Sequence, residues 1–177
     1  MTSIVAYRHQ LGLTLVELCI VILLLVMGAC IAVPALQALV DRQHHASTLL
    51  ILSAQLDYAR QQGVQRAQRI RVCPLSNTGR CGKDWSLGWQ ILDAEGQVLL
   101  STSLVHRRQR LLLSSPSATA IVYQSNGTTQ MGNGTFVLCN AQGNPLWTLV
   151  LNRQGRLRQR SPEARDHARC RGLSNPT

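Results

Sequence analysis

Gly12-Leu13-Thr14-Leu15-Val16-Glu17 begins a nearly uninterrupted apolar run that continues to Val33. The 21 residues from Leu13 to Val33 measure about 31 Å as an α-helix, which matches a hydrocarbon core of about 30 Å. An ionised carboxylate in hydrocarbon costs at least about 2.5 kcal/mol, so Glu17 is a candidate functional residue. Arg8 precedes the run and favours a cytoplasmic N-terminus, which places the rest of the chain outside the cytoplasm. We therefore expect a membrane-spanning helix with a glutamate near its start.

The helical pattern continues beyond Pro34, where a proline inside a helix removes one hydrogen bond and bends the axis. Small and apolar residues recur at helical spacing on one stripe: Leu49, Leu52, Leu56, Ala59 and Gly63. Asp57, Arg60 and Gln61 fall on other faces. The pattern predicts one helix of roughly fifty residues, kinked near Pro34. We expect its first half in lipid and its second half against a globular domain.

The hydrophobic period changes from helical to strand-like at Ile70. Short β-type runs are separated by Gly- and Asn-rich turn signals and cover residues 70–73, 88–92, 98–101, 110–113, 120–124, 135–140 and 147–152. These runs predict an α+β fold in which the long N-terminal helix packs against a small antiparallel β domain. The tail after Ser161 is polar and lacks periodicity, so we expect it to be loosely held unless Cys170 ties it down.

The six cysteines divide by location. Cys19 and Cys30 lie in the apolar run, where they are expected to act as small hydrophobic residues. The other four lie in the polar part of the chain and indicate two disulfides with three possible pairings: Cys73, Cys81, Cys139 and Cys170. Zinc is the competing interpretation, but the chain has no C-x2-C pair and its histidines are not at ligand spacing. No cofactor or metal is expected, and no catalytic constellation indicates an enzyme.

The N-terminal motif resembles the processing site of type IV pilins and pseudopilins. The resemblance implies that a prepilin peptidase removes residues 1–12 by cutting between Gly12 and Leu13, and that a methyltransferase then modifies the new N-terminus. It also implies that Glu17 pairs with an N-terminal amine during assembly with other pilins. Leu13 departs from the phenylalanine or methionine usual in the family, so methylation is less firmly implied than cleavage. The competing interpretations are a secretory signal peptide, a lipoprotein signal ending at Cys30, and a plain membrane anchor.

The resemblance narrows, in the β domain, to the GspH/FimT branch of minor pilins and pseudopilins. The residues that carry it are Val72-Cys73-Pro74, Cys81-Gly82-Lys83-Asp84-Trp85, Gly88-Trp89, Val137-Leu138-Cys139 and Asn152-Arg153-Gln154-Gly155-Arg156-Leu157-Arg158. It implies the pilin fold, with a leader at 1–12, a transmembrane part at 13–33, an amphipathic helical part at 34–64 and a β domain with a basic tail at 65–177. Cys73 would then close a loop with Cys81, and Cys139 would pin the tail through Cys170, although a Cys73–Cys139 link stays possible. Trp85 and Trp89 are expected to anchor the core.

Positive charge accumulates near the C-terminus of a chain whose net charge is +10. Residues 153–171 hold seven arginines against Glu163 and Asp166, which gives a net +5. The segment around Gly155 resembles the Gly-Arg-x-Arg motif of FimT-type minor pilins, in which this region binds DNA during uptake. The implied DNA-binding residues are Arg153, Gly155, Arg156, Arg158 and Arg160, with Arg107 and Arg108 as a second cluster. If Leu157 lies in a strand, Arg156 and Arg158 share one face and Arg160 extends the row.

The resulting expectation is a minor type IV pilin that binds DNA without sequence preference for natural transformation. It would reside in the bacterial inner membrane, with its C-terminal domain in the periplasm, and then enter a pilus at the cell surface. Two alternatives stay open: a minor pilin that primes pilus assembly without binding DNA, and a GspH-like pseudopilin of a type II secretion system. A solvated charged face, or one that contacts anionic lipid, is the competing interpretation of the arginines.

Overall fold

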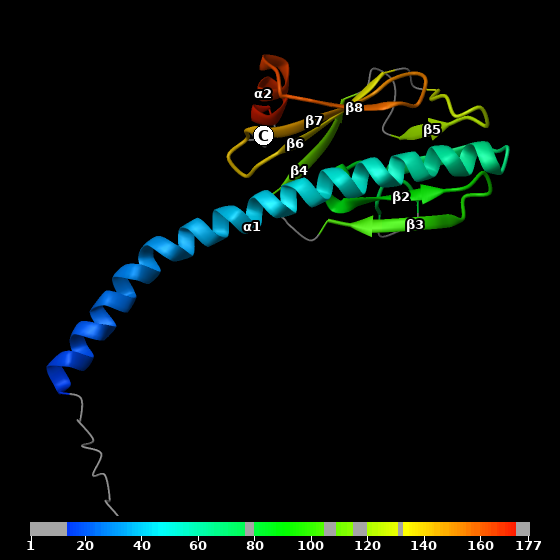
Figure 1. Ribbon diagram of the computed structural model, residues 1–177. Helices are drawn as coiled ribbons and strands as arrows, with labels where there is room; N and C mark the ends of the chain where they lie inside the picture. The colour runs from blue at the N-terminus through cyan, green and yellow to red at the C-terminus, as the bar shows by residue number, and fades with distance from the viewer. Residues whose placement is uncertain (1–13, 77–79, 105–108, 115–119, 131–132, 173–177) are drawn as a thin grey trace, which may run out of the picture. The chain divides into compact units, whose positions relative to one another are not determined.

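The computed structural model describes residues 14–76, 80–104, 109–114, 120–130 and 133–172 (Figure 1). The proposed leader, Gly12, Leu13, Arg107 and Arg108 lie outside the described residues. The elements follow the order α1 (Leu15–Gln65), β1 (Ile70–Pro74), η1 (Trp85–Leu87), β2 (Gly88–Leu92), β3 (Val98–Ser103), β4 (Arg110–Ser114), β5 (Ile121–Tyr123), β6 (Gly134–Cys139), β7 (Pro145–Leu151), β8 (Leu157–Arg160) and α2 (Ala164–Arg171). The chain divides into two compact units, residues 1–44 and 45–177.

Helix α1 begins with a side-chain cap supplied by Thr14. The Thr14 Oγ1 accepts a hydrogen bond from the Glu17 N–H at 3.2 Å. This interaction satisfies one of the N–H groups that a helix leaves unpaired in its first turn. Glu17 therefore lies in the first turn of α1, and the helix continues through Pro34 to Gln65 without a break. Its N-terminal part is long and apolar enough to cross a membrane.

The C-terminus of α1 closes with a turn centred on Ala67. The Gln68 N–H donates to the Gly63 carbonyl at 3.2 Å, and the Ala67 N–H donates to the Val64 carbonyl at 3.3 Å. Together these bonds form a Schellman motif, whose penultimate residue adopts a left-handed conformation. Ala67 has that conformation, with φ of 52°, although glycine is the residue that adopts it without steric cost.

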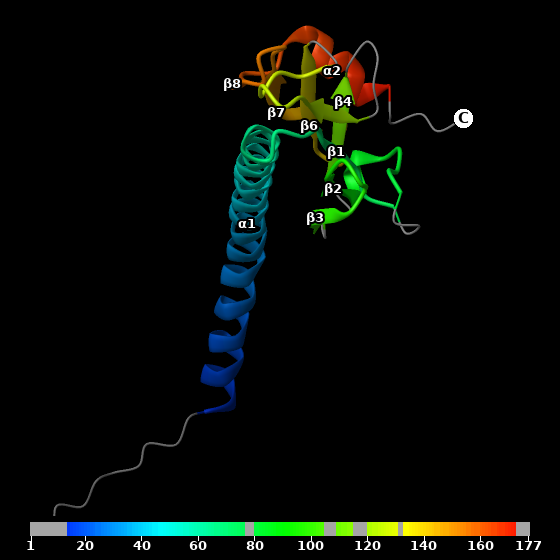
Figure 2. The same ribbon diagram turned by 90° about the vertical axis from the view of Figure 1, so that its right-hand side faces the viewer.

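The strands form two four-stranded sheets in which every pair is antiparallel. One sheet has the order β3-β2-β1-β5 and the other β4-β6-β7-β8. Figure 2 shows β1, β2 and β3 of the first sheet beside β4 and β6 of the second. Strand β8 forms an edge of the second sheet, where it pairs only with β7. The seven strands that the sequence predicts are all present, and β8 is an eighth.

One hydrophobic core joins the C-terminal half of α1 to both sheets. Leu52, Leu56 and Ala59 of the predicted helical stripe are fully buried in it. Trp85 packs edge-on against Phe136 with ring centroids 5.0 Å apart, and both tryptophans expected to anchor the core are buried. The predicted contact between the helical stripe and a globular β domain is therefore confirmed.

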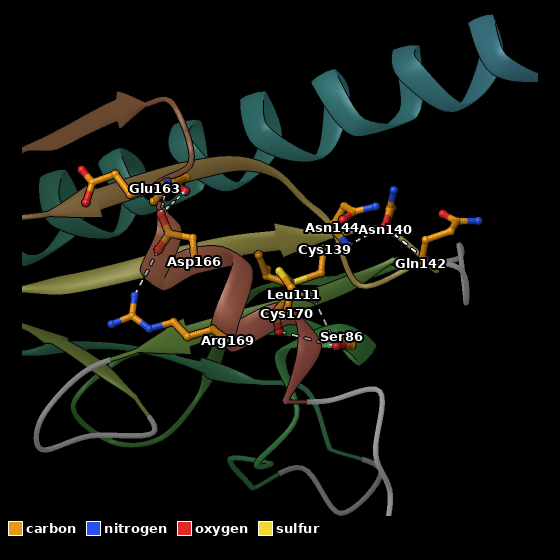
Figure 3. The surroundings of a disulfide bond; sticks show 11 residues. Ser86, Leu111, Cys139, Asn140, Gln142, Asn144, Glu163, Asp166, Arg169 and Cys170 are labelled. Atoms are coloured by element: carbon orange, nitrogen blue, oxygen red, sulfur yellow. Dashed lines mark hydrogen bonds and ion pairs between the residues drawn. A yellow bond between two sulfur atoms is a disulfide. The ribbon is translucent and has the colours of Figure 1, made fainter.

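Helix α2 covers the opposite face of the second sheet. Side chains alternate along β6, so that Phe136 and Leu138 enter the main core while Val137 and Cys139 pack with Cys170 of α2. Figure 3 shows α2 on this face, joined to β6 by the Cys139–Cys170 disulfide. The sequence left the polar tail loosely held unless Cys170 tied it down, and the Cys139–Cys170 disulfide does tie it. The helical form of residues 164–171, with its cluster of ion pairs, was not predicted.

Candidate nucleic-acid interface

The Gly-Arg-x-Arg segment forms the turn between β7 and β8. The Asn152 side chain shapes this turn, because its Oδ1 accepts a hydrogen bond from the Arg156 N–H at 2.8 Å. Gly155 has φ of +76°, and a Cβ on it would overlap the carbonyl oxygen of Gly127. Gly155 is therefore a positioning residue: its lack of a side chain lets the basic turn lie against the neighbouring hairpin turn.

The Arg60 side chain of α1 packs against two turns, the hairpin turn at Gly127 and the β7–β8 turn at Gly155. Its Nε donates a hydrogen bond to the Gly127 carbonyl at 3.0 Å. A Cβ on either Gly127 or Gly155 would come into close contact with the Arg60 side chain. The side chain is half-buried, so Arg60 contacts the domain although it falls on another face of the helix than the buried stripe. Helical periodicity missed this role because a long arginine side chain reaches across the edge of the buried stripe.

The register of β8 determines which way its side chains point. Leu157 pairs with Leu151, and Arg158 pairs with Val150. Leu157 packs against the main core, so Arg158 lies on the outer face of the sheet, the face that α2 also occupies. Successive side chains of an extended chain point to opposite faces, so Arg156 and Arg158, on either side of Leu157, lie on the same face of the sheet. The predicted shared face of Arg156 and Arg158 agrees with this register.

Arg160 lies on the same face but is bound by Asp166 of α2. Its Nη1 contacts the Asp166 Oδ2 at 2.7 Å and the Glu163 Oε1 at 3.3 Å. Arg169 also contacts Asp166, with 3.2 Å between its Nη1 and the Oδ1. Asp166 is completely buried, and its two guanidinium partners compensate the charge. Arg160 thus differs from the expected free row of arginines, because a buried carboxylate already holds it.

The environment of Asp166 stabilises its ionised form. Burial favours the neutral acid, but the backbone N–H of Glu163 and the guanidinium of Arg160 outweigh this effect, and Thr148 adds a hydrogen bond. The pKa of Asp166 therefore lies below its ordinary value. Figure 3 shows Asp166 between the start of α2 and Arg169. A signal for this arrangement was present in the sequence, since Glu163 and Asp166 have the i, i+3 spacing of a capping box, which the structure contains.

Three arginines remain available on the turn and on β8. Arg153, Arg156 and Arg158 are exposed, and their side chains have no ion pair or hydrogen bond within the described part of the chain. Their backbones are fixed: the Arg153 carbonyl accepts a hydrogen bond from the Thr129 N–H at 2.9 Å, and Asn133 binds the Arg153 N–H. Free guanidinium groups on a fixed backbone are suited to forked contacts with phosphate oxygens.

The four cysteines of the β domain form the two disulfides that the resemblance implied, Cys73–Cys81 and Cys139–Cys170. Because all four sulfur atoms are used in these bonds, they are not zinc ligands. Cys19 and Cys30 are free and exposed on α1, as expected of small hydrophobic residues in the apolar run. Among the described residues, no group of three or more His, Cys, Asp or Glu side chains is arranged to hold a metal ion.

The fold is of the pilin type: it combines a long N-terminal helix that begins with an apolar run, two small antiparallel sheets, and the helix α2 tied to β6 by a disulfide. The sequence profile described as "Type II transport protein GspH" matches residues 52–155, which is more than half of the chain. The chain therefore belongs to the GspH family. No curated protein matched the chain significantly.

Two solved structures show the same fold. The type IV minor pilin FimU of Pseudomonas aeruginosa is 22% identical, with a TM-score of 0.53, and the match covers 68% of this chain and 90% of FimU. The minor pseudopilin EpsH from the type II secretion system of Vibrio cholerae is 10% identical, with a TM-score of 0.52, and the match covers 68% of this chain and 96% of EpsH. The fold is thus shared by a type IV minor pilin and by a minor pseudopilin of a type II secretion system.

Proposed function

We propose that this chain is a minor pilin whose β7–β8 turn and strand β8 bind DNA for uptake in natural transformation. The observation that carries the proposal is the exposure of Arg153, Arg156 and Arg158 on one hydrogen-bonded turn and strand, where the described residues supply them with no acidic partner. The chain carries a net charge of +10, which favours association with a polyanion. Contacts of this kind are made to the phosphate backbone, so binding is independent of sequence and suits uptake of arbitrary DNA.

Assembly is proposed to follow the pilin pattern. A prepilin peptidase cuts after Gly12, a methyltransferase modifies Leu13, and residues 13–33 anchor the subunit in the inner membrane. Residues 34–64 then continue the helix to the β domain at 65–177, which lies in the periplasm before entry into the pilus. Glu17, in the first turn of α1, pairs with an N-terminal amine and sets the register with other pilins. The subunit acts by binding and assembly, with no catalytic step.

Binding to a fluorescent duplex, measured by anisotropy on the full-length protein in detergent micelles, tests this proposal. Arg156→Gln with Arg158→Gln removes two charges from the interface. Each phosphate contact contributes a factor of about 8 at 0.1 M salt, so the pair should weaken binding about 60-fold. Arg80→Gln with Lys83→Gln removes two exposed charges beyond the far end of β1 and serves as the matched control. Equal affinities of the interface variant and the control would reject this DNA-binding site.

A second candidate function is that of a type II secretion pseudopilin. The family description, "Type II transport protein GspH", and the similarity to EpsH favour it. A minor pilin that primes assembly without touching DNA is the related alternative. Complete absence of DNA binding by the wild-type protein at low salt would favour these two alternatives, whereas the DNA-uptake proposal predicts binding that weakens steeply as salt rises.

A further inference from the structure

A second arginine pair borders a cleft at the start of β1. Arg69 immediately precedes the strand and Arg71 lies within it, and both side chains are exposed. The cleft has a volume of about 360 Å³ and is lined by Arg69, Arg71, Asp93, Ala94, Gly96, Val122 and Gln130. We propose that this cleft binds a backbone phosphate of the same DNA that contacts the β7–β8 turn, so that the interface extends across both sheets. The inference rests on the proposed function and names further residues that contact the DNA.

The two arginines share one face and are held in place there. Ile70 and Val72 are buried in the main core, so the alternation of β1 places Arg69 and Arg71 on the outer face. The Arg69 Nε donates to the Gln124 Oε1 at 3.2 Å. This bond uses one of five N–H donors, and within the described residues the terminal nitrogens of Arg69 have no partner.

The cleft is connected to the β7–β8 turn by continuous backbone pairing. Arg71 pairs with Val122 of β5, and the neighbouring Tyr123 pairs with Thr129. The Thr129 N–H in turn donates to the Arg153 carbonyl at 2.9 Å. Three strand-to-strand steps of about 4.8 Å each set an upper limit of about 14 Å on the distance across the strands between the two segments.

This separation fits a single stretch of nucleic-acid backbone. A duplex has one phosphate per about 3.4 Å of axis on each strand, so about 14 Å corresponds to about four phosphates. Arg71 and Arg158 both lie on sheet faces turned away from the main core that α1 shares. In the proposed complex, the bound backbone runs along these outer faces from the cleft to the β7–β8 turn.

Removal of the negative charge of Asp93 tests the cleft, because it should strengthen DNA binding. Among the residues that the structure describes, Asp93 is the one acidic residue lining the cleft, and its Oδ1 accepts a hydrogen bond from the Gln97 N–H at 2.7 Å. Asp93→Asn keeps this acceptor and removes the negative charge. If a phosphate occupies the cleft about 7 Å away, loss of the repulsion should tighten binding about threefold at low salt. Misfolding cannot produce such a gain.

The salt dependence of duplex binding, measured on the full-length protein in detergent micelles, tests the cleft. Arg69→Gln with Arg71→Gln should lower the slope of log K against log salt by about 1.8, because each phosphate contact contributes about 0.9. The control, Arg80→Gln with Lys83→Gln, should retain the wild-type slope. Tryptophan fluorescence during urea unfolding should show wild-type stability for these two double variants, since the replaced side chains are exposed.

Two results would overturn the inference, and they differ in what they mean for the proposed function. An unchanged slope for Arg69→Gln with Arg71→Gln, alongside a reduced slope for Arg156→Gln with Arg158→Gln, would refute the cleft and leave the proposed function standing. Absence of salt-dependent binding by the wild-type protein would refute both. A lower slope for Arg69→Gln with Arg71→Gln, together with tighter binding by Asp93→Asn, supports the extended interface.

Discussion

Removal of the Cys139–Cys170 disulfide should destabilise the β domain more than removal of Cys73–Cys81. The first bond joins residues 31 apart in sequence and the second joins residues 8 apart. The loop-entropy relation gives about 3.7 kcal/mol for the longer loop and about 2.5 kcal/mol for the shorter one. We therefore expect the Cys139→Ala, Cys170→Ala variant to lose about 1 kcal/mol more than the Cys73→Ala, Cys81→Ala variant.

Urea unfolding of the full-length protein in detergent measures this difference. Trp85, Trp89 and Trp147 are all buried in the β domain, so their fluorescence reports its unfolding. Amide hydrogen exchange adds a local readout, since α2 should lose protection only when the longer disulfide is removed. The reasoning is refuted if the Cys73–Cys81 variant is the less stable of the two, or if α2 stays equally protected in both.

Three further predictions concern single side chains. Asp166→Asn should cost about 3 kcal/mol at pH 7, because it removes the buried carboxylate that binds the half-buried Arg160 and Arg169. The pKa of Asp166 is lowered, so its contribution is present above about pH 4 and is lost as the pH falls through the folded-state pKa. Urea unfolding should therefore show the stabilities of the two proteins converging in acid. Gly155→Ala should lower the free energy of unfolding by at least about 2 kcal/mol, through backbone strain and overlap with the Gly127 carbonyl. Gly96→Ala, at a similar φ of +83° with open space around it, should lower it by about 1 kcal/mol in the same urea measurement. Ala67→Gly should raise the melting temperature, because it relieves about 1 kcal/mol of left-handed strain; a lower melting temperature would contradict the assigned cap.

Local patterns were sufficient to predict most of the fold. The stripe containing Leu52 and Leu56 has the spacing of a buried helical face, and the structure buries it. The runs starting at Ile70 and Gly88 have strand character, and both are strands. These predictions succeed because burial follows the period of the side chains along each element.

Long-range contacts account for what the sequence did not predict. The resemblance implied the Cys139–Cys170 bond, but not that residues 164–171 form a helix. Helix α2 has few apolar residues, and its buried Asp166 is held by partners on the neighbouring strands. Arg160 belongs to the basic row in the sequence, yet the buried Asp166 binds it. Arg60 looks like a surface residue of α1, but it supports two turns that lie far along the chain. Such pairings depend on tertiary structure, which periodicity does not encode.

The salt dependence of DNA binding by wild-type protein and by Arg156→Gln with Arg158→Gln tests the central claim most directly. Two fewer phosphate contacts should lower the slope of log K against log salt by about 1.8 and weaken binding equally for duplexes of different sequence. The same slope in both proteins, or a loss confined to one sequence, would contradict the assignment of β8 and its turn as a phosphate-binding surface.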